Sequence, residues 1–297
     1  MRLANPILAA SGTFGYGIEF APLVDLNRLG GFVVKGLSAQ PMNGAPAPRL
    51  CETAGGMLNA VGLQNIGARA FVAEKLPALR SCRAAVIANV FGHSVEEYAE
   101  VIRILEDAEG LAAYELNISC PNVKRGGTQY GTEPGMTSEV VAAARQAARK
   151  RPLWVKLSPL VTDIVPIARA AEAAGADALT VANTYPAMSV DFRTRKSRLG
   201  NATGGLSGPA IKPLTLRLVH QVCRAVKVPV IGLGGIETAE DALEYILVGA
   251  SAVQVGTASF VDPRATERLV EGLWNLCQMS KLSNISDLRG AFQQDSG

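Results

Sequence analysis

The sequence predicts an α/β protein folded as a single (β/α)8 TIM barrel. Eight short apolar runs alternate with helical patterns along the 297 residues, which is typical of parallel strands joined by helices. Most of the runs are apolar throughout, as expected when both faces of a sheet are covered. Eight such units favour a closed barrel over an open sheet, which usually has about five or six strands. No linker or internal repeat divides the chain, so residues 1–297 are predicted to form one domain.

The strands are expected where β-branched and aromatic residues gather between turn residues. In chain order they are Asn5–Ser11, Gly31–Leu37, Ala84–Phe91, Tyr114–Cys120, Leu153–Ser158, Ala178–Asn183, Val228–Leu233 and Ala252–Gly256. The helices between them carry start and stop signals. Ser94-Val-Glu-Glu97 and Thr238-Ala-Glu-Asp241 match the capping box. Pro213 stands in the first turn of a helix over Ala210–Val226, and Gly175 ends another helix.

Three connections are longer than a barrel needs, and each is rich in Gly, Pro, Asn and Ser. They follow the carboxyl ends of strands and span Ser38–Asn65, Pro121–Met136 and Thr184–Gly208. Active sites of TIM barrels are built at that end, and loops of this length are usually functional. The extended loops therefore predict a site on the C-terminal face of the barrel.

The composition excludes several classes of function. The net charge of +3 is spread along the chain and aromatic residues make up 5%, which argues against nucleic-acid binding. His93 and His220 are the two histidines, so no metal site and no Ser-His-Asp triad are expected. No apolar run reaches the roughly 18 residues of a membrane span, and Asn5-Pro6 interrupts the short N-terminal run. Five cysteines without paired spacing indicate a cytoplasmic protein with free thiols.

Glycines end the last two predicted strands. Gly234-Gly235 precedes a capped helix, and Gly256-Thr257 follows the next strand. Backbone N–H groups at such turns, together with the positive end of a helix dipole, bind phosphate. Barrels commonly place a phosphate site after strands seven and eight. The two turns therefore predict a phosphate cradle, with tight turns that bind nothing as the simpler alternative.

Polar side chains end the other strands. Lys35 and Lys156 each close an apolar strand, where a lysine is costly unless it meets a negative charge, such as that of a reduced flavin ring. Cys120, before a glycine-rich loop, is the candidate base, because a thiol with an ordinary pKa near 8.5 can take a proton at neutral pH. Five asparagines favour recognition of a planar imide or urea such as a pyrimidine, since each amide is donor and acceptor. They are Asn59, Asn89, Asn117, Asn122 and Asn183.

These motifs resemble dihydroorotate dehydrogenase, specifically the catalytic subunit of its NAD-linked class (class 1B). The resemblance covers nearly the whole chain in order. The matching strings are Asn5-Pro-Ile, Ala10-Ser-Gly-Thr-Phe-Gly15, Val34-Lys-Gly36, Asn59-Ala-Val-Gly-Leu-Gln-Asn65, Asn117-Ile-Ser-Cys-Pro-Asn-Val-Lys124, Val155-Lys-Leu-Ser-Pro159, Ala182-Asn-Thr184, Thr203-Gly-Gly-Leu-Ser-Gly-Pro209, Gly232-Leu-Gly-Gly235 and Val255-Gly-Thr257.

The resemblance implies oxidation of (S)-dihydroorotate to orotate in pyrimidine biosynthesis, with one FMN per chain at the barrel mouth. Cys120 would remove the C5 proton while C6 gives a hydride to flavin N5. The implied substrate contacts are Lys35, Asn59, Ala60, Val61, Gly62, Leu63, Asn117, Asn122, Asn183 and Thr184. The implied FMN contacts are Ser11, Lys35, Gly36, Asn89, Asn117, Lys156, Val181, Gly208, Gly234, Gly235, Gly256 and Thr257.

Sequence details favour the NAD-linked class. The membrane-associated class has Ser where this chain has Cys120, and the loop Val123-Lys-Arg-Gly-Gly127 resembles the NAD-linked rather than the fumarate-linked class. The resemblance implies a homodimer that forms a heterotetramer with a subunit carrying FAD and an iron–sulfur cluster. Two alternatives stay open: a dihydropyrimidine dehydrogenase subunit acting on uracil or thymine, and a non-redox barrel such as an aldolase or isomerase that uses Lys156.

Overall fold

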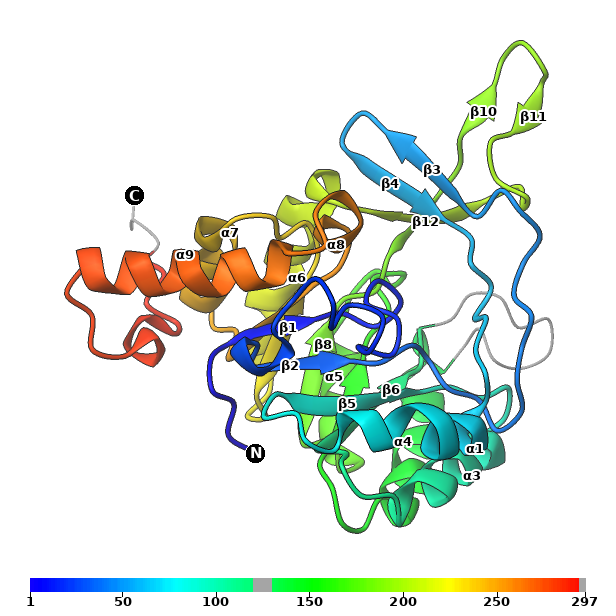
Figure 1. The fold of residues 1–297 in the computed structure, drawn as a ribbon, viewed down its shortest axis with the longest axis horizontal. Coiled ribbons are helices and arrows are strands. Elements are labelled where there is room, and N and C mark those ends of the chain that lie inside the picture. Colours follow the sequence, from blue (N-terminus) through cyan, green and yellow to red (C-terminus); the bar gives the residue numbers. More distant parts are fainter. Residues whose placement is uncertain (120–129, 294–297) are drawn as a thin grey trace.

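Eight parallel strands close into a barrel in the computed structural model, which describes residues 1–119 and 130–293 (Figure 1). The order around the barrel is β1-β14-β13-β8-β7-β6-β5-β2. Ile7 pairs with Val253, so the first barrel strand closes on the last. The predicted TIM barrel is confirmed. Its strands are β1 (Ile7–Ala9), β2 (Gly31–Val33), β5 (Ala85–Val90), β6 (Ala113–Asn117), β7 (Leu153–Lys156), β8 (Ala178–Val181), β13 (Val230–Leu233) and β14 (Ala252–Val255).

All eight predicted strands are present, but most end earlier than predicted. The run predicted over Gly31–Leu37 forms a strand only over Gly31–Val33, and Leu37 makes a single bridge to Val90. The Lys35 N–H donates to the Gly15 oxygen at 2.8 Å instead of to a neighbouring strand. The chain therefore leaves the barrel before its apolar run ends, and the last residues of that run line the mouth.

The helices cover the outside of the barrel and begin where the capping signals predict. The Ser94 hydroxyl accepts from the Glu97 N–H, and Thr238 and Asp241 form both halves of a capping box. The Glu97 carboxylate accepts from the N–H of His93, one residue earlier than expected. Within residues 1–119 and 130–293, no helix has the length and apolar character needed to cross a membrane. The longer helices are α3 (Val95–Glu106), α4 (Pro134–Ala147), α5 (Val165–Ala173), α6 (Lys212–Ala225), α7 (Ala239–Leu247) and α9 (Ala265–Met279).

Short helical turns complete the connections between these elements. They are η1 (Leu26–Arg28), α1 (Ala68–Ala70), η2 (Phe71–Lys75), α2 (Leu76–Leu79), η4 (Pro209–Ile211), α8 (Ala258–Val261) and η5 (Ile285–Leu288). Pro213 lies in the first turn of α6, as predicted, and Gly175 follows α5 with φ +102°. α5 begins at Val165, and just before it the Asp163 side chain accepts from the Val165 N–H and closes a turn.

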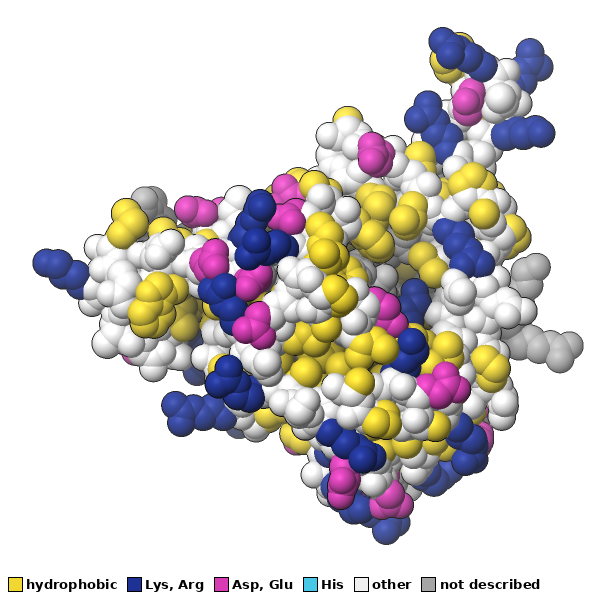
Figure 2. All heavy atoms as spheres, in the orientation of Figure 1, with side chains coloured by type: hydrophobic (Ala, Val, Ile, Leu, Met, Phe, Trp, Pro, Cys, Tyr) yellow, Lys and Arg dark blue, Asp and Glu magenta, His cyan; other side chains and the backbone are white. Residues whose placement is uncertain are grey.

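Two of the long loops contain strands that the sequence did not reveal. β3, β4, β12 and β9 form a four-stranded antiparallel sheet over the barrel mouth, and β10 and β11 form a hairpin that projects beyond it (Figure 1). Basic side chains gather at the tip of this hairpin (Figure 2). The strands are β3 (Leu50–Thr53), β4 (Gly56–Asn59), β9 (Tyr185–Ala187), β10 (Val190–Asp191), β11 (Lys196–Ser197) and β12 (Gly204–Ser207).

An apolar layer fills the barrel at the N-terminal end of its strands. It takes one residue from each of the eight strands, while alternate residues of the same strands face outward and form the larger core under the helices. This layer leaves the opposite end of the barrel for a cavity. Its members are Leu8, Val33, Ile87, Ala113, Trp154, Ala178, Ile231 and Ala252.

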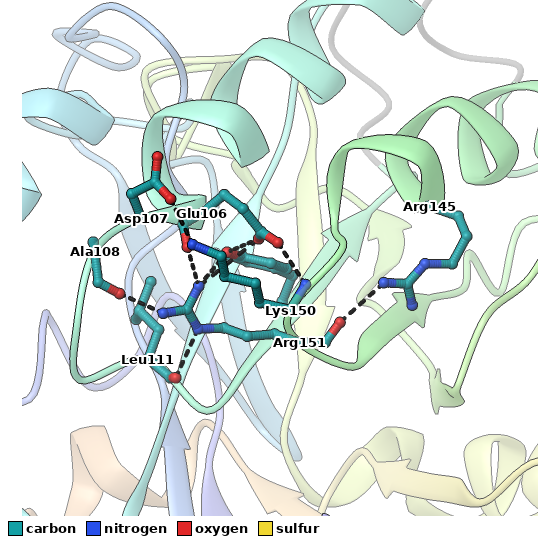
Figure 3. A network of polar contacts seen from close by, with 8 residues as sticks. Glu106, Asp107, Ala108, Leu111, Arg145, Lys150 and Arg151 are labelled. Atoms are coloured by element: carbon teal, nitrogen blue, oxygen red, sulfur yellow. Dashed lines mark hydrogen bonds and ion pairs between the residues drawn. The ribbon is translucent and has the colours of Figure 1, made fainter.

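A polar network closes the same end of the barrel from outside (Figure 3). The Arg151 guanidinium donates to the backbone oxygens of Leu111 (2.9 Å), Glu106 (2.6 Å) and Ala108. It also donates to the Tyr114 hydroxyl at 3.0 Å, and that hydroxyl donates to the Glu106 carboxylate at 2.6 Å. The network joins the end of α3 to the starts of β6 and β7. It therefore anchors two strands whose other ends carry predicted site residues.

Candidate functional site

A cavity of about 360 Å³ lies between the barrel mouth and the small antiparallel sheet. Its volume falls in the range of small-molecule sites, about 300–1,000 Å³. Within the described ranges, every predicted site residue except Val181 lines it. These residues are Ser11, Lys35, Gly36, Asn59, Ala60, Val61, Gly62, Leu63, Asn89, Asn117, Lys156, Asn183, Thr184, Gly208, Gly234, Gly235, Gly256 and Thr257.

Three predicted residues stand apart from this set. Val181 does not line the cavity; its side chain is fully buried in β8, where it faces the outer core, and Ala182 lines the cavity in its place. Cys120, the predicted base, and Asn122, a predicted substrate contact, lie outside the described residues. Their roles stay predictions.

The cavity also contains residues that the sequence did not single out. Ser119 follows Asn117 by two positions, and this spacing could have placed it on the same face as that asparagine. The residues from the small sheet belong to strands that were not predicted, and Gly204, Gly205 and Ser207 appeared only within a string that matched the family. The residues from this sheet are Leu50, Met57, Pro186, Gly204, Gly205 and Ser207.

A chain of hydrogen bonds orients two of the predicted amides. The Ser119 hydroxyl donates to Asn117 Oδ1 at 2.8 Å and accepts from Asn183 Nδ2 at 2.5 Å. The Asn183 oxygen in turn accepts from the Thr184 N–H at 2.8 Å. Because the oxygen of Asn117 is engaged, its NH2 group remains to donate to a ligand. Asn59, across the cavity on β4, donates to the Gly205 oxygen at 3.2 Å.

Both predicted lysines line the cavity and have shifted pKa values. Burial lowers the pKa of Lys35, and the charge of Arg49 lowers it further. Burial also lowers the pKa of Lys156, while the charge of Glu115 raises it. Each ammonium is therefore held at a cost that an anionic ligand would reduce.

The cavity floor rests on a buried carboxylate that the sequence reasoning missed. Glu115 is fully buried inside the barrel and accepts hydrogen bonds from Asn89 (2.8 Å), Thr180 (2.9 Å) and Gln254 (2.6 Å). Asn89 Oδ1 is buried and has no partner among the described residues. Other atoms of Asn89 line the cavity, whereas this oxygen is itself buried.

The glycines of the predicted phosphate cradle line the cavity, and Gly208 lines it as well. A Cβ on Gly235, which has φ +67°, would lie 2.8 Å from the Gly208 oxygen, and one on Gly208 would lie 2.7 Å from the Gly56 Cα. The turns therefore exclude side chains and expose backbone. The start of α7 offers fewer free N–H groups to a phosphate than expected. The N–H groups of Glu237, Thr238 and Asp241 already donate to side chains of the helix's own capping box.

The fold and the site define a TIM-barrel protein whose mouth suits a planar, phosphorylated ligand with negative charge near two lysines. The family model for dihydroorotate dehydrogenase matches residues 1–276, and the chain belongs to the dihydroorotate dehydrogenase family. The family match supports the predicted resemblance over the two alternatives, a dihydropyrimidine dehydrogenase subunit and a non-redox barrel.

The chain is also similar to curated relatives over nearly its full length. It is 58% identical to a putative dihydroorotate dehydrogenase A (fumarate) of Solibacter usitatus, over 99% of this chain and 96% of the relative. It is 57% identical to the catalytic subunit of dihydroorotate dehydrogenase B (NAD(+)) of Trichlorobacter lovleyi and 55% identical to that of Pelobacter propionicus, with the same coverage. Further relatives at 50–54% identity are also named as catalytic subunits of dihydroorotate dehydrogenase B (NAD(+)).

Proposed function

We propose that this chain oxidises dihydroorotate to orotate with FMN, as the catalytic subunit of the NAD-linked enzyme. The observation that carries the proposal is the cavity: residues expected from the family resemblance at distant points of the chain line one space at the barrel mouth. That space takes residues from Ala10 to Phe260, so we infer that the chain works as a single domain.

The residues present fit FMN. Gly208, Gly234, Gly235 and Gly256 line the cavity, and backbone without side chains there can approach a phosphate. Lys156 offers a positive charge in the floor. When bound, FMN supplies the acceptor for the hydride that leaves dihydroorotate C6.

The chain's own residues supply binding and proton transfer. Lys35 and the free NH2 group of Asn117 suit the carboxylate and carbonyl oxygens of the substrate. The Cys120 thiolate takes the proton from C5 and becomes a thiol; the electron pair of that C–H bond forms the C5=C6 double bond as the hydride leaves C6. The small sheet covers the mouth and excludes water from the reacting atoms.

Anaerobic mixing of the FMN-loaded protein with dihydroorotate tests the reaction. We expect a yellow protein whose flavin absorbance bleaches in a single turnover. Cys120→Ala should keep FMN and slow this bleaching by about 10²–10⁴-fold, the usual contribution of a general base. Cys277→Ala, in α9 and away from the cavity, is the matched control and should bleach at the normal rate. A protein that cannot be loaded with FMN, or a Cys120→Ala variant with normal bleaching, would contradict the proposal.

The electron acceptor needs its own experiment, because the relatives carry two class names. We propose a homodimer joined to an electron-transfer subunit with FAD and an iron–sulfur cluster, forming a heterotetramer that reduces NAD. The chain alone should then turn over slowly with NAD and with fumarate, and NAD reduction should rise when that subunit is co-purified. Rapid dihydroorotate-dependent fumarate reduction by the chain alone would assign it to the other class.

A further inference from the structure

The barrel interior holds an ionisable group that the proposed reaction does not use. Glu115 is 0% exposed and lies on β6 two residues before Asn117, on the inward face. Barrel interiors are usually filled by branched apolar side chains, and a buried charge is costly unless it is paired and hydrogen-bonded. A carboxylate directly beneath the cavity therefore calls for a functional explanation.

The neighbours of Glu115 all donate hydrogen bonds to its carboxylate oxygens. The NH2 groups of Asn89 and Gln254 can only donate, and an ionised carboxylate can only accept. With Thr180 they provide three donors from three other strands, β5, β14 and β8. The same bonds orient the amides, because each NH2 group turned toward Glu115 leaves its oxygen facing away. Asn89 Oδ1 and Gln254 Oε1 are the resulting buried oxygens without a partner among the described residues.

The carboxylate is hydrogen-bonded to a neighbour of Lys156 in the barrel. Thr180, whose hydroxyl donates to Glu115, is the register partner of Lys156 on β8, and Asn117 is its partner on β6. Lys156 is 5% exposed and makes no hydrogen bond or ion pair with another described residue. Among the described residues, the other charged side chains that line the cavity are Lys35 and Glu237. The charge of Glu115 supports the protonated form of Lys156 against burial, which lowers its pKa.

We propose that Glu115 is a positioning residue that keeps the Lys156 ammonium charged in the cavity floor and fixes the orientation of the Asn89 amide beside it. This inference rests on the proposed function for the identity of the ligand, FMN. Glu115 is then the group that sets the charge of the cavity floor beneath the ligand. Reduced flavin carries more negative charge than oxidised flavin, so a charged Lys156 favours the reduced form. Without Glu115 the buried lysine loses its counter-charge, so its protonated form is favoured less.

The first test uses apo-protein and needs no flavin. Thermal denaturation is measured for Glu115→Gln, Lys156→Met and the double variant. Each single change should lower Tm, and the double variant should be at least as stable as Lys156→Met, because that change alone leaves the carboxylate uncompensated. Thr180→Val, which removes one donor and keeps both charges, should lower Tm equally with and without Lys156→Met. If the double variant is less stable than Lys156→Met, the proposed pairing of Glu115 with Lys156 is wrong. This comparison can be made even if Glu115→Gln alone fails to fold.

The second test measures the ratio of the dissociation constants of oxidised and reduced FMN. Glu115→Gln should weaken the preference for reduced FMN by about tenfold or more, as Lys156→Met does, and the double variant should show no further loss. Thr180→Val should change the ratio by less than about threefold. An unchanged or stronger preference for reduced FMN in Glu115→Gln overturns the proposal, because it means that Lys156 keeps its charge. A wild-type protein that binds no FMN refutes the proposed function, whereas the apo-protein test still decides the pairing.

Discussion

Replacing Arg151 by Met removes the centre of the network that closes the N-terminal end of the barrel (Figure 3). The change leaves the backbone oxygens of Leu111, Glu106 and Ala108 without their guanidinium donors. It also leaves the Glu106 carboxylate without the cation that lies 3.8 Å away. The Tyr114 hydroxyl and the Lys150 N–H still donate to that carboxylate, so the loss is large but not complete.

The expected magnitude follows from burial. The side chains of Arg151 and Glu106 are 14% and 11% exposed, and removing one partner of such a pair costs about 3–5 kcal/mol. At about 2 °C per kcal/mol for a chain of this size, Tm should fall by roughly 6–10 °C. Lys150→Met is the matched control, because its ion pair with Asp107 joins side chains that are 61% and 88% exposed. Such exposed pairs often contribute nothing measurable.

Differential scanning fluorimetry of both variants, with FMN titration as a second readout, checks this reasoning. FMN affinity should be unchanged in each variant, because the network lies at the opposite end of the barrel from the cavity. Equal Tm values for Arg151→Met and Lys150→Met would refute the burial argument. A large loss of FMN affinity in Arg151→Met would show that the two ends of the barrel are coupled.

Three further changes test the cavity and its surroundings. Gly235→Ala forces a Cβ to 2.8 Å from the Gly208 oxygen. It should weaken FMN binding about 5–30-fold, the equivalent of one or two kcal/mol. Gly290→Ala, at a similar positive φ but with open space around it, is the control and should leave FMN binding unchanged in the same titration. Burial and the Arg49 charge lower the pKa of Lys35. As pH rises, the affinity for orotate should therefore begin to fall at a lower pH than it would with an ordinary lysine. The same loss of orotate affinity with pH in Lys35→Met would contradict this assignment. Burial raises the pKa of Asp241, but the hydrogen bond from Lys212 and two backbone N–H groups outweighs burial and holds it below its usual value. Its stabilisation is therefore present above about pH 4 and lost as pH falls, so Asp241→Asn should lower Tm at neutral pH and reduce the loss of Tm on acidification.

The barrel could be predicted because each of its strands carries its own signal. Runs such as those ending at Lys35 and Lys156 are apolar throughout, and a polar residue that ends such a run is conspicuous. The mouth of a barrel gathers strand ends from the whole chain, so finding the ends also located the cavity. Val181 was predicted beside the cofactor but does not line the cavity, because a strand residue next to the site can face the outer core.

Two features could not be predicted because they depend on pairing between distant segments. The strands of the small sheet are only three or four residues long, and Asn59 reaches the Gly205 oxygen across 146 positions of sequence. Glu115 is a single charge within an apolar run, and its partners Thr180 and Gln254 lie on two other barrel strands. Nothing in the local sequence shows that three strands place their donors at one height inside the barrel. The register between the strands sets these heights, and the register is known only once the barrel has closed.

The closing pair of barrel strands has a consequence for how the chain is made. β1 pairs with β14, and Ile7 lies opposite Val253, so a growing chain cannot close its barrel until nearly all of it has left the ribosome. The roof of the cavity likewise waits for β12 to meet β4, and the last glycine turn of the cradle lies beyond β14. Loading with the cofactor is therefore a late step that follows synthesis, and truncated chains that end before Gly256 should be unable to retain it.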